Sequence, residues 1–296
     1  MGCPARFSLG VTGSARDQPA HSLIRASAPV AEHFRSFNRF VAMDYLIAFV
    51  GALLAGGINT LSGNGSAITL TILMELLGLP PDVANGTNRV GILFNAVGGT
   101  AGFARGGRFA QPTAHRRQMW RIIIITSLGA VVGIYWSLII SNEAYRQAFR
   151  YLLVVMLVVI LVKPKRWLRA PAAQPPLALW LTVPLFFALG VYGGFIQMGF
   201  GVFFLAVMVL AARYDLIQAN VLKVVTVLIY TILAVGIFAW RGLIDWRIGL
   251  VMGVAQLVGG YLTAKFAATH PKAGVIAYWL LVVVVLAAVL RAFVFT

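Results

Sequence analysis

Long apolar segments recur from Tyr45 to the end of the chain, separated by short stretches rich in glycine, proline or charge. Runs of this length predict α-helices, and their recurrence predicts an all-α, polytopic transmembrane bundle. Ten segments are expected, at residues 45–62, 66–79, 83–104, 122–140, 148–162, 177–198, 202–212, 216–240, 248–264 and 274–294. At about 1.5 Å per residue, the second and seventh reach only about 21 Å and 16 Å, short of a hydrocarbon core of about 30 Å. We therefore expect eight full spans and two short or re-entrant helices.

The pattern occurs twice, because a glycine doublet followed by a Gly-x-Gly sequence precedes each short segment. Further pairs follow in the same order: Asn85 and Asn220, Phe103 and Phe238, Trp120 and Trp246, Gly133 and Gly259, Tyr151 and Tyr278. We predict repeat one at residues 44–163, a basic, proline-containing linker at 164–176 and repeat two at 177–296. Since each repeat has five segments, the two repeats should enter the membrane in opposite senses.

Composition supports a membrane protein. The chain is 60% hydrophobic and 11% charged, whereas a soluble domain is about 45–50% apolar and about 25% charged. Its net charge of +16 comes from cations in short stretches between apolar segments, a distribution that orients membrane proteins and does not favour nucleic acid as a partner. The basic stretches at 105–121 and 163–169 are separated by an even number of crossings, so both are expected in the cytoplasm.

Residues 1–43 form a separate N-terminal region. They contain five arginines and no apolar run long enough for a signal peptide. We expect a disordered tail; alternatively, translation begins at Met43, which directly precedes the first apolar segment.

The two glycine-rich breaks are the first candidate for a binding site. A helix interrupted at membrane depth exposes backbone amides, and the first amides of the following helix attract anions. The residues predicted to form such a site near the midplane are Asn59, Gly63, Asn64 and Gly65 at the first break and Gln197, Gly199 and Gly201 at the second. The alternative is that the glycines only permit close helix packing.

The third and eighth segments carry a second group of candidates. Their polar residues are Asn85, Asn88 and Arg89 in the third segment and Asn220 and Lys223 in the eighth. Arg89 and Lys223 lie about 10 Å and 12 Å inside their segments, where an unpaired cation costs at least a few kcal/mol. No acidic residue lies at a similar depth, so both cations are candidates to bind a mobile anion, with the asparagines as hydrogen-bond donors. The alternative is structural: Glu75 pairs with Arg89, or Lys223 binds carbonyls at a helix end.

Enzymatic chemistry lacks the required groups. The apolar segments contain no histidine and no pair of carboxylates at one depth, and the single cysteine, Cys3, lies in the N-terminal region. Metal, acid–base and thiol chemistry therefore have no candidate residues. We expect no catalytic residue, no metal site and no cofactor.

Several of these motifs resemble those of the TauE/SafE family of membrane transporters, the sulfite exporters. They are Gly56–Asn59, Gly63–Gly65, Leu77–Pro81, Val83–Asn88, Arg241–Arg247 and Gly259-Gly260. The resemblance covers about residues 44–295. It implies a multi-pass transporter of the bacterial inner membrane, surrounded by lipid, that moves small anions such as sulfite, sulfonates or related organosulfur acids. Two positions depart from the family pattern, Asn64 and Asn88-Arg89, and the second bears on substrate preference if Arg89 faces the site.

The sequence thus favours a transporter in which one repeat rocks against the other around a midplane anion site. Two other functions remain open. An anion channel would use the same donors without saturable exchange, and a non-transporting membrane scaffold would explain the glycines by packing alone.

Overall fold

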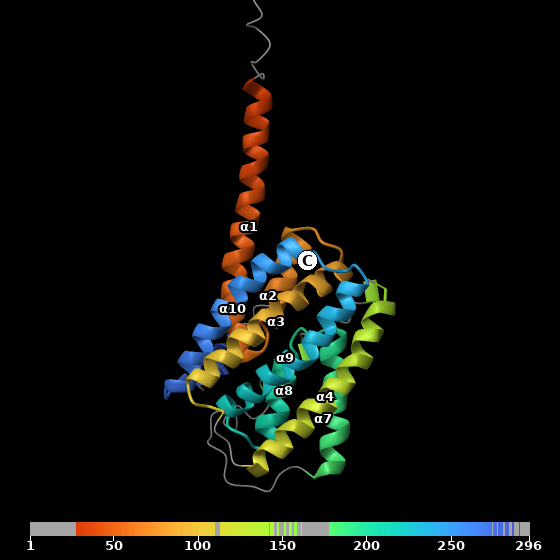
Figure 1. Cartoon of the computed structure of the whole chain (residues 1–296), viewed down its shortest axis with the longest axis vertical. Coiled ribbons are helices and arrows are strands. Elements are labelled where there is room, and N and C mark those ends of the chain that lie inside the picture. The colour runs from red at the N-terminus through yellow and green to blue at the C-terminus, as the bar shows by residue number, and fades with distance from the viewer. Residues whose placement is uncertain are drawn as a thin grey trace, which may run out of the picture. The chain divides into compact units, whose positions relative to one another are not determined.

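The computed structural model describes residues 28–109, 113–141 and 178–273, together with scattered residues between 143 and 161 and between 275 and 290. The chain divides into two units, residues 1–42 and 43–296. In the first unit, residues 28–42 are helical. Every regular element of the second unit among the described residues is also helical (Figure 1), which confirms the all-α prediction.

The helices follow the predicted segments closely. Their bounds are α1 (Ala28–Ser62), α2 (Gly65–Thr71), the π-helix η1 (Ile72–Leu76), α3 (Pro81–Arg105), α4 (Thr113–Ile139), α7 (Leu179–Phe195), α8 (Phe200–Ala206), the π-helix η2 (Val207–Ala211), α9 (Leu216–Trp240) and α10 (Trp246–Thr269). Four described segments are long and apolar enough to cross a membrane: Met43–Ser62, Arg117–Ile139, Leu216–Trp240 and Trp246–Thr269. Helix α3 has the same length as α9, 25 residues, but its polar residues lower its hydropathy.

Some boundaries differ from the prediction. Helix α1 as described begins at Ala28, well before Tyr45. Helix α4 begins at Thr113 and not near residue 122, because no glycine or proline interrupts the basic stretch after Thr113; its arginines therefore lie in the first turns of a helix. Most of the predicted segments 148–162 and 274–294, the linker 164–176 and residues 1–27 lie outside the described residues.

Local sequence explains where the helices start. Pro80 is extended and Pro81 occupies the first turn of α3, where its missing N–H costs no hydrogen bond. The carboxylate of Asp215 accepts hydrogen bonds from the amides of Ile217 and Gln218 at the start of α9. Asp245 caps α10 in the same way. These caps satisfy amides that a helix leaves unpaired.

Two interrupted hairpins have matching backbones. Helix α1 ends before Gly63, whose φ is 78°, and α7 ends shortly before Gly199, whose φ is 70°. Both values lie in the left-handed region that glycine adopts without strain. Each break is followed by a seven-residue α-helix that continues as a five-residue π-helix, α2–η1 and α8–η2. The two short helices predicted from the sequence are thus present.

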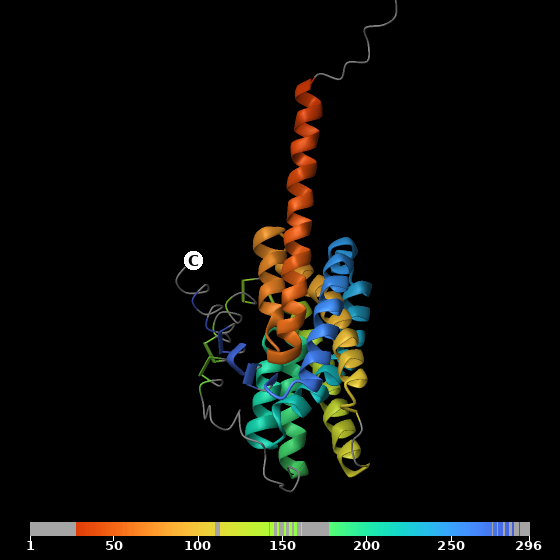
Figure 2. The ribbon, with the colours of Figure 1, turned by 90° about the vertical axis from the view of Figure 1, so that its left-hand side faces the viewer.

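The long helices pack across the midpoint of the chain. Helix α10 packs against α3 along most of its length, and Figures 1 and 2 show the two side by side. It also contacts α1, because a methyl group at Gly259 would overlap the Leu53 carbonyl oxygen. Helix α4 packs against α7 and α9, and α3 meets α9 at the centre. Each fourth helix therefore packs on the first and third helices of the opposite half.

Candidate functional site

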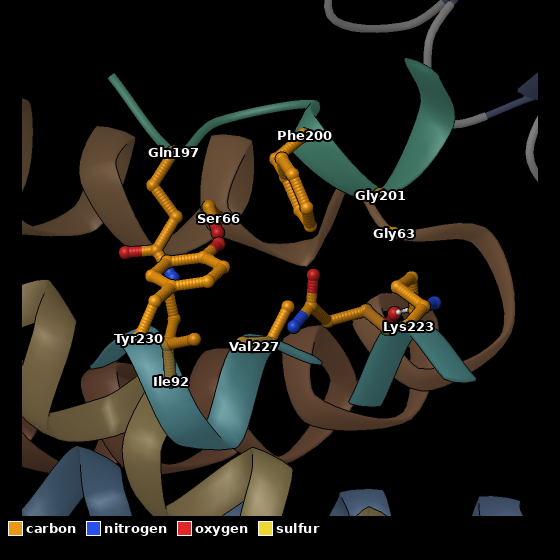
Figure 3. A pocket seen from close by; sticks show the side chains of 10 residues that line it. Gly63, Ser66, Ile92, Gln197, Phe200, Gly201, Lys223, Val227 and Tyr230 are labelled. Atoms are coloured by element: carbon orange, nitrogen blue, oxygen red, sulfur yellow. Dashed lines mark hydrogen bonds between the residues drawn. The ribbon is translucent and has the colours of Figure 1, made fainter. Parts of the chain in front are cut away.

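A small pocket lies where the two interrupted hairpins meet. Its lining residues are Asn59, Gly63, Ser66, Ile92, Gln197, Phe200, Gly201, Lys223, Val227 and Tyr230. They come from α1, α2, α3, α8, α9 and the turns that precede the short helices. In Figure 3, Lys223 lies at one end of the pocket and Gln197 and Tyr230 lie at the other. The pocket therefore combines one cation with several uncharged polar groups.

The two breaks touch each other directly beside this pocket. A methyl group added at Gly63 would overlap the Cα of Gly201, and one added at Gly201 would overlap the Cα of Gly63. Figure 3 shows these two glycines next to each other. Only residues without a side chain allow this approach, so the contact explains why a glycine occurs at each position. The packing explanation for these two glycines is therefore confirmed, and anion binding between the breaks stays a prediction.

Lys223 is buried and fully hydrogen-bonded. Its ammonium donates to the carbonyl oxygens of Asn59 and Thr60, both at 2.9 Å, and to the Asn220 side-chain oxygen at 2.6 Å. The two carbonyls belong to the last turn of α1, where the helix dipole is negative, and the Asn59 oxygen also accepts a hydrogen bond of 2.9 Å from the Gly63 amide. The structural alternative given for Lys223 is therefore present, and the same ammonium also lines the pocket.

Arg89 makes the reciprocal contact with the other broken helix. Its guanidinium donates to the carbonyl oxygens of Gly193 at 3.0 Å and Gly194 at 2.6 Å, in the last turn of α7. It also lies 5.7 Å from the ring centre of Phe238. Glu75 is exposed and is not its partner. Arg89 does not line the pocket, so its predicted contact with a bound anion has no support in this geometry.

An asparagine network holds α1 against its neighbours. The Asn95 amide group of α3 donates to the Gly56 carbonyl oxygen at 2.8 Å and to the Gln256 carbonyl oxygen at 3.2 Å. Its oxygen accepts a hydrogen bond of 2.8 Å from the Asn59 side chain. This network fixes the wall of the pocket that Asn59 forms.

The predicted site residues divide into three groups. Those that line the pocket are Asn59, Gly63, Gln197, Gly201 and Lys223. Those next to it in the turns or on the lysine are Asn64, Gly65, Gly199 and Asn220. Those that lie elsewhere on α3 are Asn85, Asn88 and Arg89. The Asn88 oxygen accepts a hydrogen bond of 2.6 Å from Thr69 of α2, which gives it a packing partner.

Sequence reasoning placed Ser66 beside the first break without assigning it to the site, and it missed Ile92, Phe200, Val227 and Tyr230 as pocket residues. For Val227 and Tyr230, the sequence contained a spacing that could have identified them. Val227 and Tyr230 lie four and seven residues after Lys223 on the same helix. Residues at these spacings share one face of a helix. Projecting that face from Lys223 would have identified the aromatic end of the pocket.

Several buried polar atoms around the pocket make no hydrogen bond within the described part of the chain. They include both side-chain heteroatoms of Asn64 and the Gln197 oxygen. Burial of a polar group without a partner costs about 1–3 kcal/mol. The pocket volume is about 10 Å3, which is room for about one water molecule. In the described conformation the pocket is therefore narrow, and a ligand could satisfy the polar groups around it.

Comparison with known proteins identifies the family. The family described as sulfite exporter TauE/SafE matches residues 48–291. The chain belongs to this TauE/SafE family. This confirms the resemblance drawn from the two breaks and the motifs around them. As a member, it is a multi-pass membrane transporter, and the family implies a small anion as substrate.

Two relatives agree with this assignment. A probable membrane transporter protein, ORF9, from Sinorhizobium sp. is 27% identical over 82% of this chain and 90% of its own length. A probable membrane transporter protein from Haemophilus influenzae is 26% identical over 78% of this chain and 89% of its own length. No solved structure matches the chain significantly.

Proposed function

We propose that this TauE/SafE member carries small sulfur-containing anions, such as sulfite, sulfonates or related organosulfur acids, across the bacterial inner membrane. The anion binds in the pocket between the Gly63 and Gly201 turns. Lys223 supplies positive charge, and Asn59, Ser66 and Gln197 supply hydrogen-bond donors from different walls. Access to the pocket alternates between the two membrane faces.

The observation that carries this proposal is the position of Lys223. A buried ammonium lines a pocket formed by two broken helices, and no carboxylate among the described residues lines it. Metal and acid–base roles lack the necessary groups in this pocket, whereas an anion would add negative charge beside the lysine. The aromatic end, formed by Phe200 and Tyr230, suits an anion that also carries a small organic group.

Reciprocal packing supports two inverted repeats at residues 44–163 and 177–296. Gly133 of α4 lies against Val191 of α7, and its predicted counterpart Gly259 of α10 lies against Leu53 of α1. Likewise Arg89 binds the end of α7 and Lys223 binds the end of α1. Such exchanged contacts are expected when two equivalent halves are related by an approximate twofold axis. We propose eight spans and two short helices, with α3 as one of the spans.

Because the fourth helix of each repeat packs on the other repeat, the two bodies proposed to move differ from the two sequence repeats. The first body comprises α1, α2, η1, α3 and α10, and the second comprises α4, α7, α8, η2 and α9. Each body thus takes its fourth helix from the other repeat. We propose that these exchanged bundles rock against each other, in place of the sequence repeats themselves. The pocket lies on their shared boundary, where α3 meets α9.

A counterflow screen in proteoliposomes tests the proposed function. Vesicles loaded with unlabelled sulfite, sulfoacetate or methanesulfonate are diluted into a trace of the labelled anion. We expect labelled anion to accumulate transiently and the uptake to saturate for at least one of these three, because a carrier exchanges one bound anion for another.

Two outcomes would contradict the proposal. Flux that rises linearly with concentration and shows no counterflow would indicate a channel. No flux of any of the three anions, from protein that is folded and inserted, would remove sulfur anions as substrates. Protein-free vesicles and vesicles containing the Gly201→Ala variant provide the background.

A further inference from the structure

Lys223 has no free N–H group in the described conformation. An ammonium has three donors, and Asn59, Thr60 and Asn220 accept one each. Two of these bonds reach the last turn of α1, which belongs to the opposite bundle. Lys223 also lines the pocket proposed to hold the anion. A direct hydrogen bond from Lys223 to an anion therefore requires that at least one present bond breaks.

The carbonyl oxygens of α1 and an anion in the pocket compete for the same N–H groups of Lys223. The last turn of α1 presents partial negative charge to Lys223, and an anion presents a full one. A hydrogen bond between two ions is stronger than one between an ion and a neutral carbonyl. An anion that enters the pocket is thus able to displace a carbonyl, and this displacement loosens a contact between the two bundles.

We infer that Lys223 is a latch, which holds the bundles together in the empty transporter and is released when the anion takes over the ammonium. This inference rests on the proposed function, because it assumes that the pocket binds the transported anion. It assigns Lys223 two successive partners, the end of α1 and then the anion. The narrow pocket, with room for about one water, corresponds to the latched state.

Arg89 shows why only one of the two reciprocal contacts works as a latch. Its guanidinium has five donors and binds the Gly193 and Gly194 carbonyls, but it does not line the pocket. Because Arg89 is not among the lining residues, an anion bound in the pocket does not contact it. Arg89 therefore keeps α7 in place throughout the cycle, while the bond between Lys223 and α1 opens and closes.

While Lys223 remains bonded to α1, the empty transporter should switch slowly between facing one side of the membrane and facing the other. Release of anion into an anion-free compartment should then be slow, because the empty protein must return while it is latched. Release into a compartment that contains the anion should be fast. Transport becomes an exchange, and the size of the difference measures the latch.

The test compares efflux of labelled sulfoacetate from proteoliposomes into two buffers, one with sulfoacetate and one with gluconate. For the wild-type protein we expect efflux to be at least about tenfold faster with external sulfoacetate, the factor that corresponds to one hydrogen bond to a charged group. For Lys223→Met we expect a ratio near one. The ratio is measured within one preparation, so it does not depend on the amount of folded protein.

Thr226→Val is the matched control. Thr226 is buried on the same helix and, within the described part of the chain, its hydroxyl donates only to the Leu222 carbonyl oxygen of that helix, so its replacement should leave the efflux ratio at the wild-type value. A wild-type ratio near one, or a Lys223→Met ratio equal to the wild-type ratio, would overturn the latch.

A second measurement decides the case in which Lys223→Met transports nothing. Ser66→Cys places a thiol in the pocket, and Cys3→Ser removes the native one. In anion-free membranes we expect a small maleimide to label Ser66→Cys at least about tenfold faster when Lys223→Met is also present, because the bundles part without the latch. Equal labelling rates would overturn the inference. If the wild-type protein transports none of the tested anions but labelling responds as expected, the proposed substrate class fails and the latch stands.

Discussion

At the scale of single residues, Lys223 combines two roles that are usually assigned to different side chains. It neutralises the negative end of α1 and it faces the pocket. The sequence identified it because a lysine at that depth has no acidic partner. The sequence could not identify the carbonyl oxygens as its partners, because every residue carries one and only the fold decides which of them a helix leaves unpaired.

The Lys223→Arg variant keeps the positive charge and increases the number of N–H donors, so it tests these two properties separately. An arginine has five N–H groups, so Lys223→Arg can hold the α1 carbonyls and an anion at the same time. We expect KM for sulfoacetate to change by less than about threefold and kcat to fall by about tenfold or more. Initial rates of counterflow over a range of concentrations measure both constants. Wild-type kcat in Lys223→Arg would show that charge alone matters.

The contact between Gly63 and Gly201 makes a second prediction at this scale. A methyl group at Gly201 overlaps the backbone of Gly63, so Gly201→Ala should abolish counterflow by displacing the two turns. At Gly236, within α9 and four residues before its end, an added methyl group would meet nothing within 4 Å. Gly236→Ala should therefore retain transport and stabilise the protein by about 0.5–1 kcal/mol. Transport by Gly201→Ala at the wild-type rate would contradict the close approach.

At the scale of helices, the sequence predicted the elements well and their partners poorly. Glycine doublets, Gly-x-Gly turns and short apolar runs are local signals, and they located α2 and α8 correctly. The exchange of α4 and α10 between the two halves has no local signal in the sequence. A glycine such as Gly133 indicates that another helix packs closely there, but it does not indicate which helix. The same limit applies to Arg89, whose contact with α7 joins residues more than a hundred positions apart.

Arg89 should contribute strongly to stability. Its two hydrogen bonds cap the broken end of α7, and each bond from a charged group contributes about 1.5–3 kcal/mol. We expect Arg89→Met to destabilise the protein by about 3 kcal/mol or more and Arg89→Lys to lose less, because lysine keeps the charge. Thermal unfolding in detergent, followed by tryptophan fluorescence, measures the difference. The exposed Arg241→Gln is the control, and an unchanged unfolding temperature in Arg89→Met would refute the capping role.

At the scale of the whole transporter, charged residues at helix ends indicate its orientation. The Arg108 guanidinium donates to the Ala268 carbonyl oxygen, so the ends of α3 and α10 lie together. Arg105 and Arg108 at the end of α3 and Lys265 and Lys272 near the end of α10 are expected on the cytoplasmic side, whereas Arg241 and Arg247 at the start of α10 make the charge bias of this repeat weak. Arg241 lies before α10, and Lys272 follows it, so they are separated by a helix of 24 residues.

Cysteine labelling tests this orientation. In a Cys3→Ser background, a membrane-impermeant maleimide should label Lys272→Cys only in inside-out vesicles and Arg241→Cys only in right-side-out vesicles. Both positions are exposed, so lack of access would come from the membrane and not from packing. The opposite pattern would invert the proposed topology, and labelling of both from one side would exclude α10 as a span.

The central claim is that a small anion binds between the two glycine turns beside the charge of Lys223. Counterflow of labelled sulfite, sulfoacetate and methanesulfonate by wild type, Lys223→Gln and Thr226→Val tests it most directly, with all three proteins reconstituted at equal density. We predict that Thr226→Val exchanges anions like the wild type and that Lys223→Gln, which keeps a donor but loses the charge, is at least about tenfold slower. Folded Lys223→Gln that exchanges these anions at the wild-type rate would contradict the claim.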